Sequence, residues 1–255
     1  MRLEKELVVR DLLVSYIETD GAMSDVPLVF LHGWRSSKDA WNRALDACSE
    51  YGRHAYALDL PGFGRSESPN GAYDVHLYAD LVKEFLSKLG VSRAIIVGHS
   101  FGGRIAIVLA AKHASVVHKL VLVDSAGVRQ KSASLSIMNV FARIMKPFFA
   151  PSFMHPLRRA VYRFIGADDY LETPHLKETF IKTIEEDLTP LLPSISSETL
   201  IIWGENDTDT PLAHAALMKE QIPNASLVVL KAAGHFSFMD APDAFAKELL
   251  KFISI

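Results

Sequence analysis

The stretch that decides the fold reads Ile95-Ile96-Val97-Gly98-His99-Ser100-Phe101-Gly102-Gly103-Arg104-Ile105. The apolar residues before Gly98 predict a buried strand, and residues 104–112 are apolar nearly all round, as in a helix packed against a sheet. A tight turn between the two lifts the Ser100 hydroxyl above the sheet, where flanking side chains larger than glycine would clash. The pattern therefore predicts an exposed serine nucleophile.

Other glycine-rich turns also join a strand to a helix, and two of them do not fit. A dinucleotide-binding turn needs a glycine where the backbone approaches the pyrophosphate, and Ser100 stands at that place. A P-loop ends in Gly-Lys-Ser/Thr, which is missing here. An ordinary serine in a glycine-rich turn is the remaining alternative to a nucleophile.

Composition and charge exclude several classes of protein. The 255 residues are 49% hydrophobic and 22% charged, an ordinary globular composition. Lys and Arg number 27 against 30 Asp and Glu, so we expect no nucleic-acid partner. The lone Cys48 excludes an internal disulfide and a cysteine-based zinc site. The apolar runs are too short for membrane insertion, and the first residues lack a signal peptide's apolar segment, so we expect a cytoplasmic protein.

Strand-like and helix-like segments alternate along most of the chain. Strands are predicted at residues 7–10, 12–17, 28–31, 54–58, 94–97, 120–123, 200–203 and 227–230, and helices at 75–89, 104–112, 212–221 and 242–252. This order predicts an α/β fold with a mostly parallel central sheet and helices on both faces. Residues 127–190 contain no clear strand and predict a helical cap inserted into a core of residues 1–126 and 191–255.

A serine nucleophile needs a base and a carboxylate that orients the base. Of the ten histidines, His235 is the one that follows the last predicted strand and precedes the last helix. His99, beside the turn, is expected to pack beneath it. Asp207, in the loop after residues 200–203, is the predicted acid. Asp209 is a close rival with an alternative role as a helix cap, and Asp124 is a third candidate.

Backbone N–H groups are expected to bind the oxyanion that forms during acyl transfer. The Phe101 amide lies at the start of the helix after Ser100. The loop after residues 28–31 reads His32-Gly33-Trp34, and Gly33 allows this loop to approach the turn closely. The amides of Trp34 and Phe101 are therefore the predicted oxyanion hole.

Together these residues resemble the α/β-hydrolase superfamily over nearly the whole chain. The motifs are His32-Gly33-Trp34, Asp59-Leu60-Pro61-Gly62-Phe63-Gly64-Arg65-Ser66, Gly98-His99-Ser100-Phe101-Gly102-Gly103, Trp203-Gly204-Glu205-Asn206-Asp207 and Gly234-His235-Phe236. The resemblance implies that the nucleophile, acid and base are Ser100, Asp207 and His235. The cap resembles the lid of esterases and C–C hydrolases, whereas haloalkane dehalogenases and epoxide hydrolases carry Asp at the nucleophile.

The expected activity is hydrolysis of carboxylic esters with small to medium apolar acyl groups, on a small-molecule substrate. The predicted substrate-binding residues are Phe141, Met145, Phe148 and Phe236, although cap side chains of this kind can equally pack the cap on the core. No metal or organic cofactor is expected. C–C bond hydrolysis, amide hydrolysis and non-hydrolytic ligand binding are the alternatives, and one sequence leaves the oligomeric state open.

Overall fold

The computed structural model describes residues 2–21, 26–128 and 174–254. Its strands are β1 (Arg2–Val9), β2 (Leu12–Thr19), β3 (Leu28–Leu31), β4 (Ala55–Leu58), β5 (Ala94–His99), β6 (Val117–Val123), β7 (Glu198–Gly204) and β8 (Ala225–Leu230). Its α-helices are α1 (Asn42–Glu50), α2 (Val75–Lys88), α3 (Phe101–Lys112), α7 (Lys177–Glu185), α8 (Leu212–Gln221), α9 (Ser237–Asp240) and α10 (Pro242–Ile253). Short 3₁₀ helices are η1 (Lys38–Trp41), η2 (Ala114–Val116), η4 (Pro174–Leu176) and η5 (Thr189–Ser194).

The strands form one sheet in the order β1-β2-β4-β3-β5-β6-β7-β8. β1 and β2 are antiparallel, β2 meets β4 antiparallel, and all pairs from β4 to β8 are parallel. The mostly parallel sheet predicted from the sequence is therefore confirmed. In the sheet, β4 lies on one side of β3 and β5 lies on the other. The strand order therefore reverses after β4, and the ends of β3 and β5 lie at the point of reversal. Ligands of open α/β sheets bind at such points.

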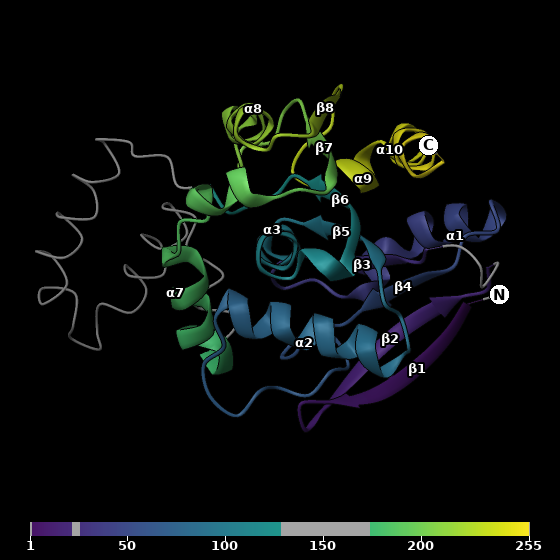
Figure 1. The fold of residues 1–255 in the computed structure, drawn as a ribbon, viewed down its shortest axis with the longest axis vertical. Coiled ribbons are helices and arrows are strands. Elements are labelled where there is room, and N and C mark those ends of the chain that lie inside the picture. Colours follow the sequence, from purple (N-terminus) through teal and green to yellow (C-terminus); the bar gives the residue numbers. More distant parts are fainter. Residues whose placement is uncertain (1, 22–25, 129–173, 255) are drawn as a thin grey trace, which may run out of the picture.

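Helices cover both faces of the sheet, and alternate residues of each strand pack against different helices. In β3, Val29 and Leu31 belong to the core that contains α2, α3 and α8, whereas Leu28 and Phe30 belong to the core that contains α1 and α10. Figure 1 shows α2 and α3 on one side of the sheet and α1 and α10 on the other. All four β3 side chains are fully buried, which explains why this strand reads as a continuous apolar run.

β1 begins before the strand predicted at residues 7–10. The prediction missed the first half of β1 because that half carries no alternation of apolar residues. Arg2, Glu4 and Glu6 are among its exposed or half-buried side chains, as is common at the edge of a sheet. A tight turn then joins β1 to β2, and both of its central residues, Arg10 and Asp11, have positive φ angles of 52° and 61°. This is the backbone that a two-residue hairpin requires.

Three of the described α-helices, α1, α7 and α9, were not predicted individually from the sequence patterns. α1 is short and buries only Ala44, Leu45 and Cys48, and α7 buries two threonines, Thr179 and Thr183, instead of an apolar stripe. α7 lies within the predicted cap of residues 127–190, of which residues 129–173 are outside the described part of the chain. Among the residues that the structure describes, no helix is both long enough and apolar enough to cross a bilayer.

Candidate active site

Five loops meet at the carboxyl edge of the sheet, because parallel strands end on the same side. These loops follow β3, β5, β6, β7 and β8, and they carry, in that order, Trp34, Ser100, Asp124, Asp207 and His235. The sequence separates Ser100 from His235 by 135 positions. The order of the strands brings them together.

The turn at Ser100 has a strained backbone that the surrounding glycines permit. Ser100 has φ 49° and ψ −109°, a conformation that residues with a side chain rarely adopt. A Cβ atom at Gly98 would lie 2.5 Å from the carbonyl oxygen of Gly102, and one at Gly102 would lie 2.2 Å from that of Leu31. The Ser100 N–H donates to the carbonyl of Val123 at 3.1 Å, which fixes the turn against β6.

Ser100, His235 and Asp207 form a continuous line of hydrogen-bonding groups. The Nε2 atom of His235 lies 3.0 Å from the Ser100 Oγ, and its Nδ1 atom lies 3.0 Å from the Asp207 Oδ2. The Asp207 side chain is fully buried, and 13% of the His235 side chain is exposed. Because the carboxylate accepts the Nδ1–H proton, Nε2 is left free to accept the proton of the serine hydroxyl.

Four donors hold Asp207 in its ionised form. Besides His235, the backbone N–H groups of Asp209 and Thr210 each donate to Oδ1 at 2.9 Å, and the Thr210 hydroxyl lies 2.6 Å from Oδ2. Burial alone would raise the pKa of Asp207, but these hydrogen bonds and the nearby imidazole lower it below its usual value. Burial likewise favours neutral His235, yet the hydrogen bond and charge of Asp207 raise the pKa of the imidazole.

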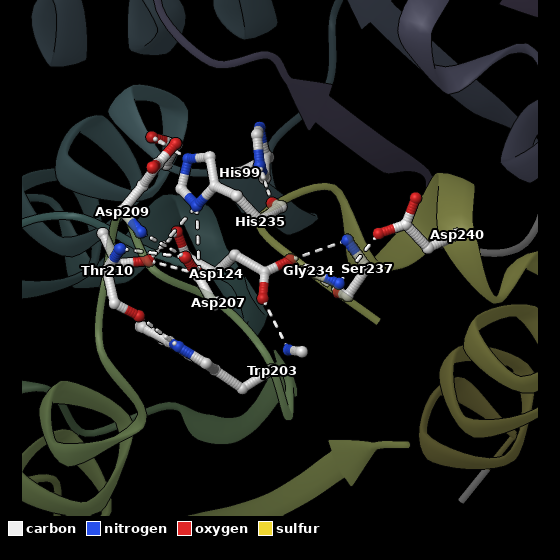
Figure 2. A network of polar contacts seen from close by, with 12 residues as sticks. His99, Asp124, Trp203, Asp207, Asp209, Thr210, Gly234, His235, Ser237 and Asp240 are labelled. Carbon is white, nitrogen blue, oxygen red and sulfur yellow. Dashed lines mark hydrogen bonds and ion pairs between the residues drawn. The ribbon is translucent and has the colours of Figure 1, made fainter. Parts of the chain in front are cut away.

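The two other predicted acids have different roles in the structure. The Asp209 side chain is exposed, and its backbone N–H serves Asp207. It does not cap α8, which begins at Leu212 with Pro211 in the capping position and no side-chain cap. Asp124 is fully buried and accepts hydrogen bonds from Gly204 and Ser237. Figure 2 shows Asp207, and neither rival, next to the Nδ1 atom of His235.

His99 lies beside His235 and supports its backbone. It is buried, and its Nε2–H donates to the backbone carbonyl of His235 at 2.8 Å. Burial lowers the pKa of His99 to about 3, so the ring stays neutral. Phe236, predicted to bind substrate, is 42% exposed, and its ring lies 5.0 Å from that of His99 and 5.5 Å from that of His235. Phe141, Met145 and Phe148, the other predicted substrate-binding residues, lie outside the described residues.

The peptide between Gly33 and Trp34 has a fixed orientation. Its carbonyl oxygen accepts a hydrogen bond from His32 Nδ1–H at 2.7 Å and one from the Ser36 N–H at 3.2 Å. The carbonyl and the N–H of a trans peptide point in opposite directions, so the Trp34 N–H points away from these donors. The Phe101 N–H opens α3 and has no acceptor within the helix.

Aromatic packing surrounds the two predicted oxyanion residues. The Trp34 ring lies 5.2 Å from that of Phe101, 4.9 Å from that of Phe63 and 5.0 Å from that of Phe180 on α7. These edge-on and tilted contacts hold the loop after β3 against the start of α3. α7 thus reaches the candidate site from the part of the chain that was predicted to form a cap.

A buried ion pair lies where the loop after β3 enters η1. Lys38 Nζ lies 2.7 Å from Asp59 Oδ2, and both side chains are almost completely excluded from solvent. Asp59 also accepts the backbone N–H groups of Lys38 and Arg65. A Cβ atom at Gly64 would lie 2.2 Å from the Asp59 carboxyl carbon, which explains the glycine in this motif. The acidic start of the motif therefore has a structural role.

The sequence analysis missed two polar side chains of the site, Thr210 and Ser237. Thr210 stands three residues after Asp207, the spacing of a turn in which an aspartate accepts backbone N–H groups, so that signal was present. Ser237 offers no local pattern, because its partner Asp124 is 113 positions away. Across residues 2–21, 26–128 and 174–254, no group of three or more His, Cys, Asp or Glu side chains is arranged to hold a metal ion.

A mostly parallel sheet with Ser, Asp and His on loops at its carboxyl edge, in that chain order, defines the class of α/β hydrolases. The family model described as "Alpha/beta hydrolase family" matches residues 28–248, and the chain belongs to this family.

The chain is similar to proteins named as a dienedioate hydrolase, a lipase and a phospholipase. The chain is 26% identical to a 2-hydroxy-6-oxononadienedioate/2-hydroxy-6-oxononatrienedioate hydrolase of Pseudomonas sp, over 92% of this chain and 90% of that one. It is also 26% identical to Lipase 3 of Moraxella sp. (strain TA144), over 89% of this chain and 76% of that one. Among solved structures, a membrane phospholipase A called a bacterial virulence factor is 28% identical, with a TM-score of 0.80, covering 99% of this chain and 86% of that one.

Proposed function

We propose that this hydrolase cleaves carboxylic esters of small to medium apolar acyl groups, with Ser100 as nucleophile, His235 as general base and Asp207 as the orienting acid. The observation that carries the proposal is the line of contacts at 3.0 Å from Asp207 through His235 to Ser100. The strained turn that exposes Ser100 supports the same assignment.

In the proposed mechanism, His235 Nε2 takes the proton of Ser100 as Oγ attacks the ester carbonyl. Asp207 stabilises the imidazolium that forms and keeps the Nδ1–H tautomer in place. The imidazolium then protonates the leaving alcohol, which departs and leaves an acyl-enzyme on Ser100. A water molecule, deprotonated by the same imidazole, then attacks the acyl carbonyl, and the acid departs as the imidazolium returns its proton to the Ser100 Oγ.

The oxyanion of each tetrahedral intermediate is assigned to the N–H groups of Trp34 and Phe101. Support comes from the fixed orientation of the Gly33–Trp34 peptide and from the place of Phe101 at the start of α3. Loss of one such donor costs about 3–4 kcal/mol of transition-state stabilisation in serine hydrolases. Both donors are backbone groups, so side-chain substitution of either residue tests the surrounding packing more than the donor itself.

The ester substrate is supported by the surroundings of Ser100 and by the relatives. The exposed Phe236 and the aromatic contacts of Trp34, Phe101 and Phe180 make the neighbourhood apolar. A lipase and a membrane phospholipase A are among the proteins to which the chain is similar, which supports the ester substrate. We also assign Phe141, Met145 and Phe148 to substrate binding, and residues 127–190 to a cap inserted into a core of residues 1–126 and 191–255.

Cleavage of a C–C bond is the second candidate. It is supported by the similarity to the 2-hydroxy-6-oxononadienedioate/2-hydroxy-6-oxononatrienedioate hydrolase of Pseudomonas sp, which covers 92% of this chain. The same Ser100, His235 and Asp207 would serve that reaction. Non-hydrolytic binding of a small ligand would instead show as slow turnover together with a large ligand-induced rise in Tm.

The test is a panel of p-nitrophenyl esters of increasing acyl length, run beside a ring-cleavage dienoate, on the wild type and on Ser100→Ala. Faster turnover of a short or medium ester than of the dienoate, abolished by Ser100→Ala, supports the proposal. Faster turnover of the dienoate favours the second candidate. Ester turnover that survives Ser100→Ala contradicts the nucleophile.

A further inference from the structure

Asp124 is a buried carboxylate that the proposed mechanism does not use. It follows the last residue of β6, has a positive φ of 43° and is fully excluded from solvent. A buried carboxylate without a role is unusual, because removing such a group from water is costly unless it is well paired. Its partners therefore indicate what it does.

The Asp124 side chain joins the strand that leads to the acid with the loop that carries the base. Its Oδ1 accepts the N–H of Gly204, the last residue of β7, at 2.7 Å. Its Oδ2 accepts the N–H of Ser237 at 3.1 Å and the Ser237 hydroxyl at 2.5 Å. Gly204 stands three residues before Asp207, and Ser237 stands two residues after His235 and opens α9. Figure 2 shows Asp124 and Ser237 beside the contact between Asp207 and His235.

The pattern of donors requires a carboxylate. Three donors point at the two oxygens of Asp124, and each oxygen receives at least one backbone N–H. An asparagine amide would have to turn its NH₂ group toward one of these backbone N–H groups, so one contact would become a clash of donors. Burial raises the pKa of Asp124 to about 7, and the three hydrogen bonds oppose that rise.

The negative charge of Asp124 also acts on the base. Asp207, Asp209 and Asp124 all favour the protonated imidazole of His235, with Asp207 contributing most. Asp124 therefore reaches the base in two ways, through the loop that it fastens and through its charge.

We propose that Asp124 is a positioning residue of the reaction centre, which clamps the end of β7 to the start of α9 and so keeps the His235 imidazole within reach of both Asp207 and Ser100. The proposal rests on the proposed function, because it assigns His235 as the base. If Asp124 only stabilised the fold, its substitution would lower Tm but would leave the kcat of the folded variant and its pH profile unchanged.

The experiment compares Asp124→Asn and Ser237→Ala with a matched control, Asp240→Asn. The Asp240 carboxylate accepts the Gly234 N–H at 2.8 Å and so also touches the loop of His235, but its side chain is exposed. For each folded variant, Tm, kcat, KM and the pH dependence of kcat/KM are measured with the best p-nitrophenyl ester.

We expect Asp124→Asn to lower kcat by about 100-fold, as small misplacements of catalytic groups do, with little change in KM. The acidic limb of kcat/KM should move to lower pH by a small amount, because Asp124 contributes the least of the three carboxylates and, with its pKa raised to about 7, is partly protonated in that range. Ser237→Ala, which keeps the charge, should lower kcat several-fold, and Asp240→Asn should leave kcat unchanged.

Wild-type kcat and an unmoved acidic limb in folded Asp124→Asn would overturn the proposal. If Asp124→Asn does not fold, a wild-type kcat in Ser237→Ala overturns the proposal instead. The pKa of His235, followed by NMR of its ring in the wild type and Asp124→Asn, separates this inference from the proposed function. A downward shift in an enzyme without Ser100-dependent turnover would contradict the function while supporting the coupling.

Discussion

Replacing Asp207 by asparagine tests the geometry of the site most directly, because the substitution keeps the shape of the side chain. The Asp207 Oδ1 accepts two backbone N–H groups, from Asp209 and Thr210, each at 2.9 Å. An asparagine will keep its carbonyl oxygen on that side, since its NH₂ group would otherwise face two donors. The NH₂ group then points at His235 Nδ1, where the Oδ2 atom of Asp207 lies 3.0 Å away in the wild type.

The expected consequence is a change of tautomer. Facing an NH₂ donor, the Nδ1 atom of His235 becomes the acceptor and the ring proton moves to Nε2, which can no longer take the proton of Ser100. The same substitution in a serine protease lowers kcat by about 10⁴-fold, and at 1.36 kcal/mol per factor of ten this corresponds to about 5 kcal/mol. We expect a loss of this size in Asp207→Asn with little change in KM.

The assay is steady-state hydrolysis of a p-nitrophenyl ester, with Tm measured on the same preparations. Asp209→Asn is the matched control, because the Asp209 side chain is exposed and only its backbone N–H serves the site. Its kcat should stay close to that of the wild type. If Asp207→Asn keeps most of its kcat, or if Asp209→Asn loses as much, the assignment of the acid is refuted.

Three further predictions concern pH and stability. The raised pKa of His235 should place the acidic limb of kcat/KM above pH 6.5, the usual pKa of a histidine, because turnover needs the neutral imidazole and falls as the pH drops below its pKa. An acidic limb below pH 6.5 would contradict the coupling of His235 to Asp207. Gly103→Ala should lower the free energy of unfolding by about 1–3 kcal/mol in urea titrations, because its Cβ would lie 2.0 Å from Ser125 Oγ, and an unchanged value would show that the helix can shift. Lys38→Met should cost about 3–5 kcal/mol in the same titrations, because it leaves Asp59 buried without its countercharge, and a cost typical of an exposed lysine would count against that pair.

Patterns of short range in the sequence were sufficient to predict the sheet and the turn at its centre. Strands such as β3 and β5 are buried on both faces and read as apolar runs, and Gly98 and Gly102 mark the turn because a side chain there would meet the backbone. Where burial leaves no apolar pattern, the prediction was incomplete. β1 is a charged edge strand, and α7 packs threonines against the core.

The sequence by itself was enough to predict the serine at the turn, the order of the proposed nucleophile, acid and base, and His235 among ten histidines, because these predictions follow from residue types and from their places after strands. Only the tertiary structure decided which of three nearby carboxylates hydrogen-bonds to the imidazole. A hydrogen bond forms over about 3 Å, and the path of a loop, which no local pattern specifies, places Asp207 at that distance while it turns Asp209 outward and Asp124 toward Gly204 and Ser237.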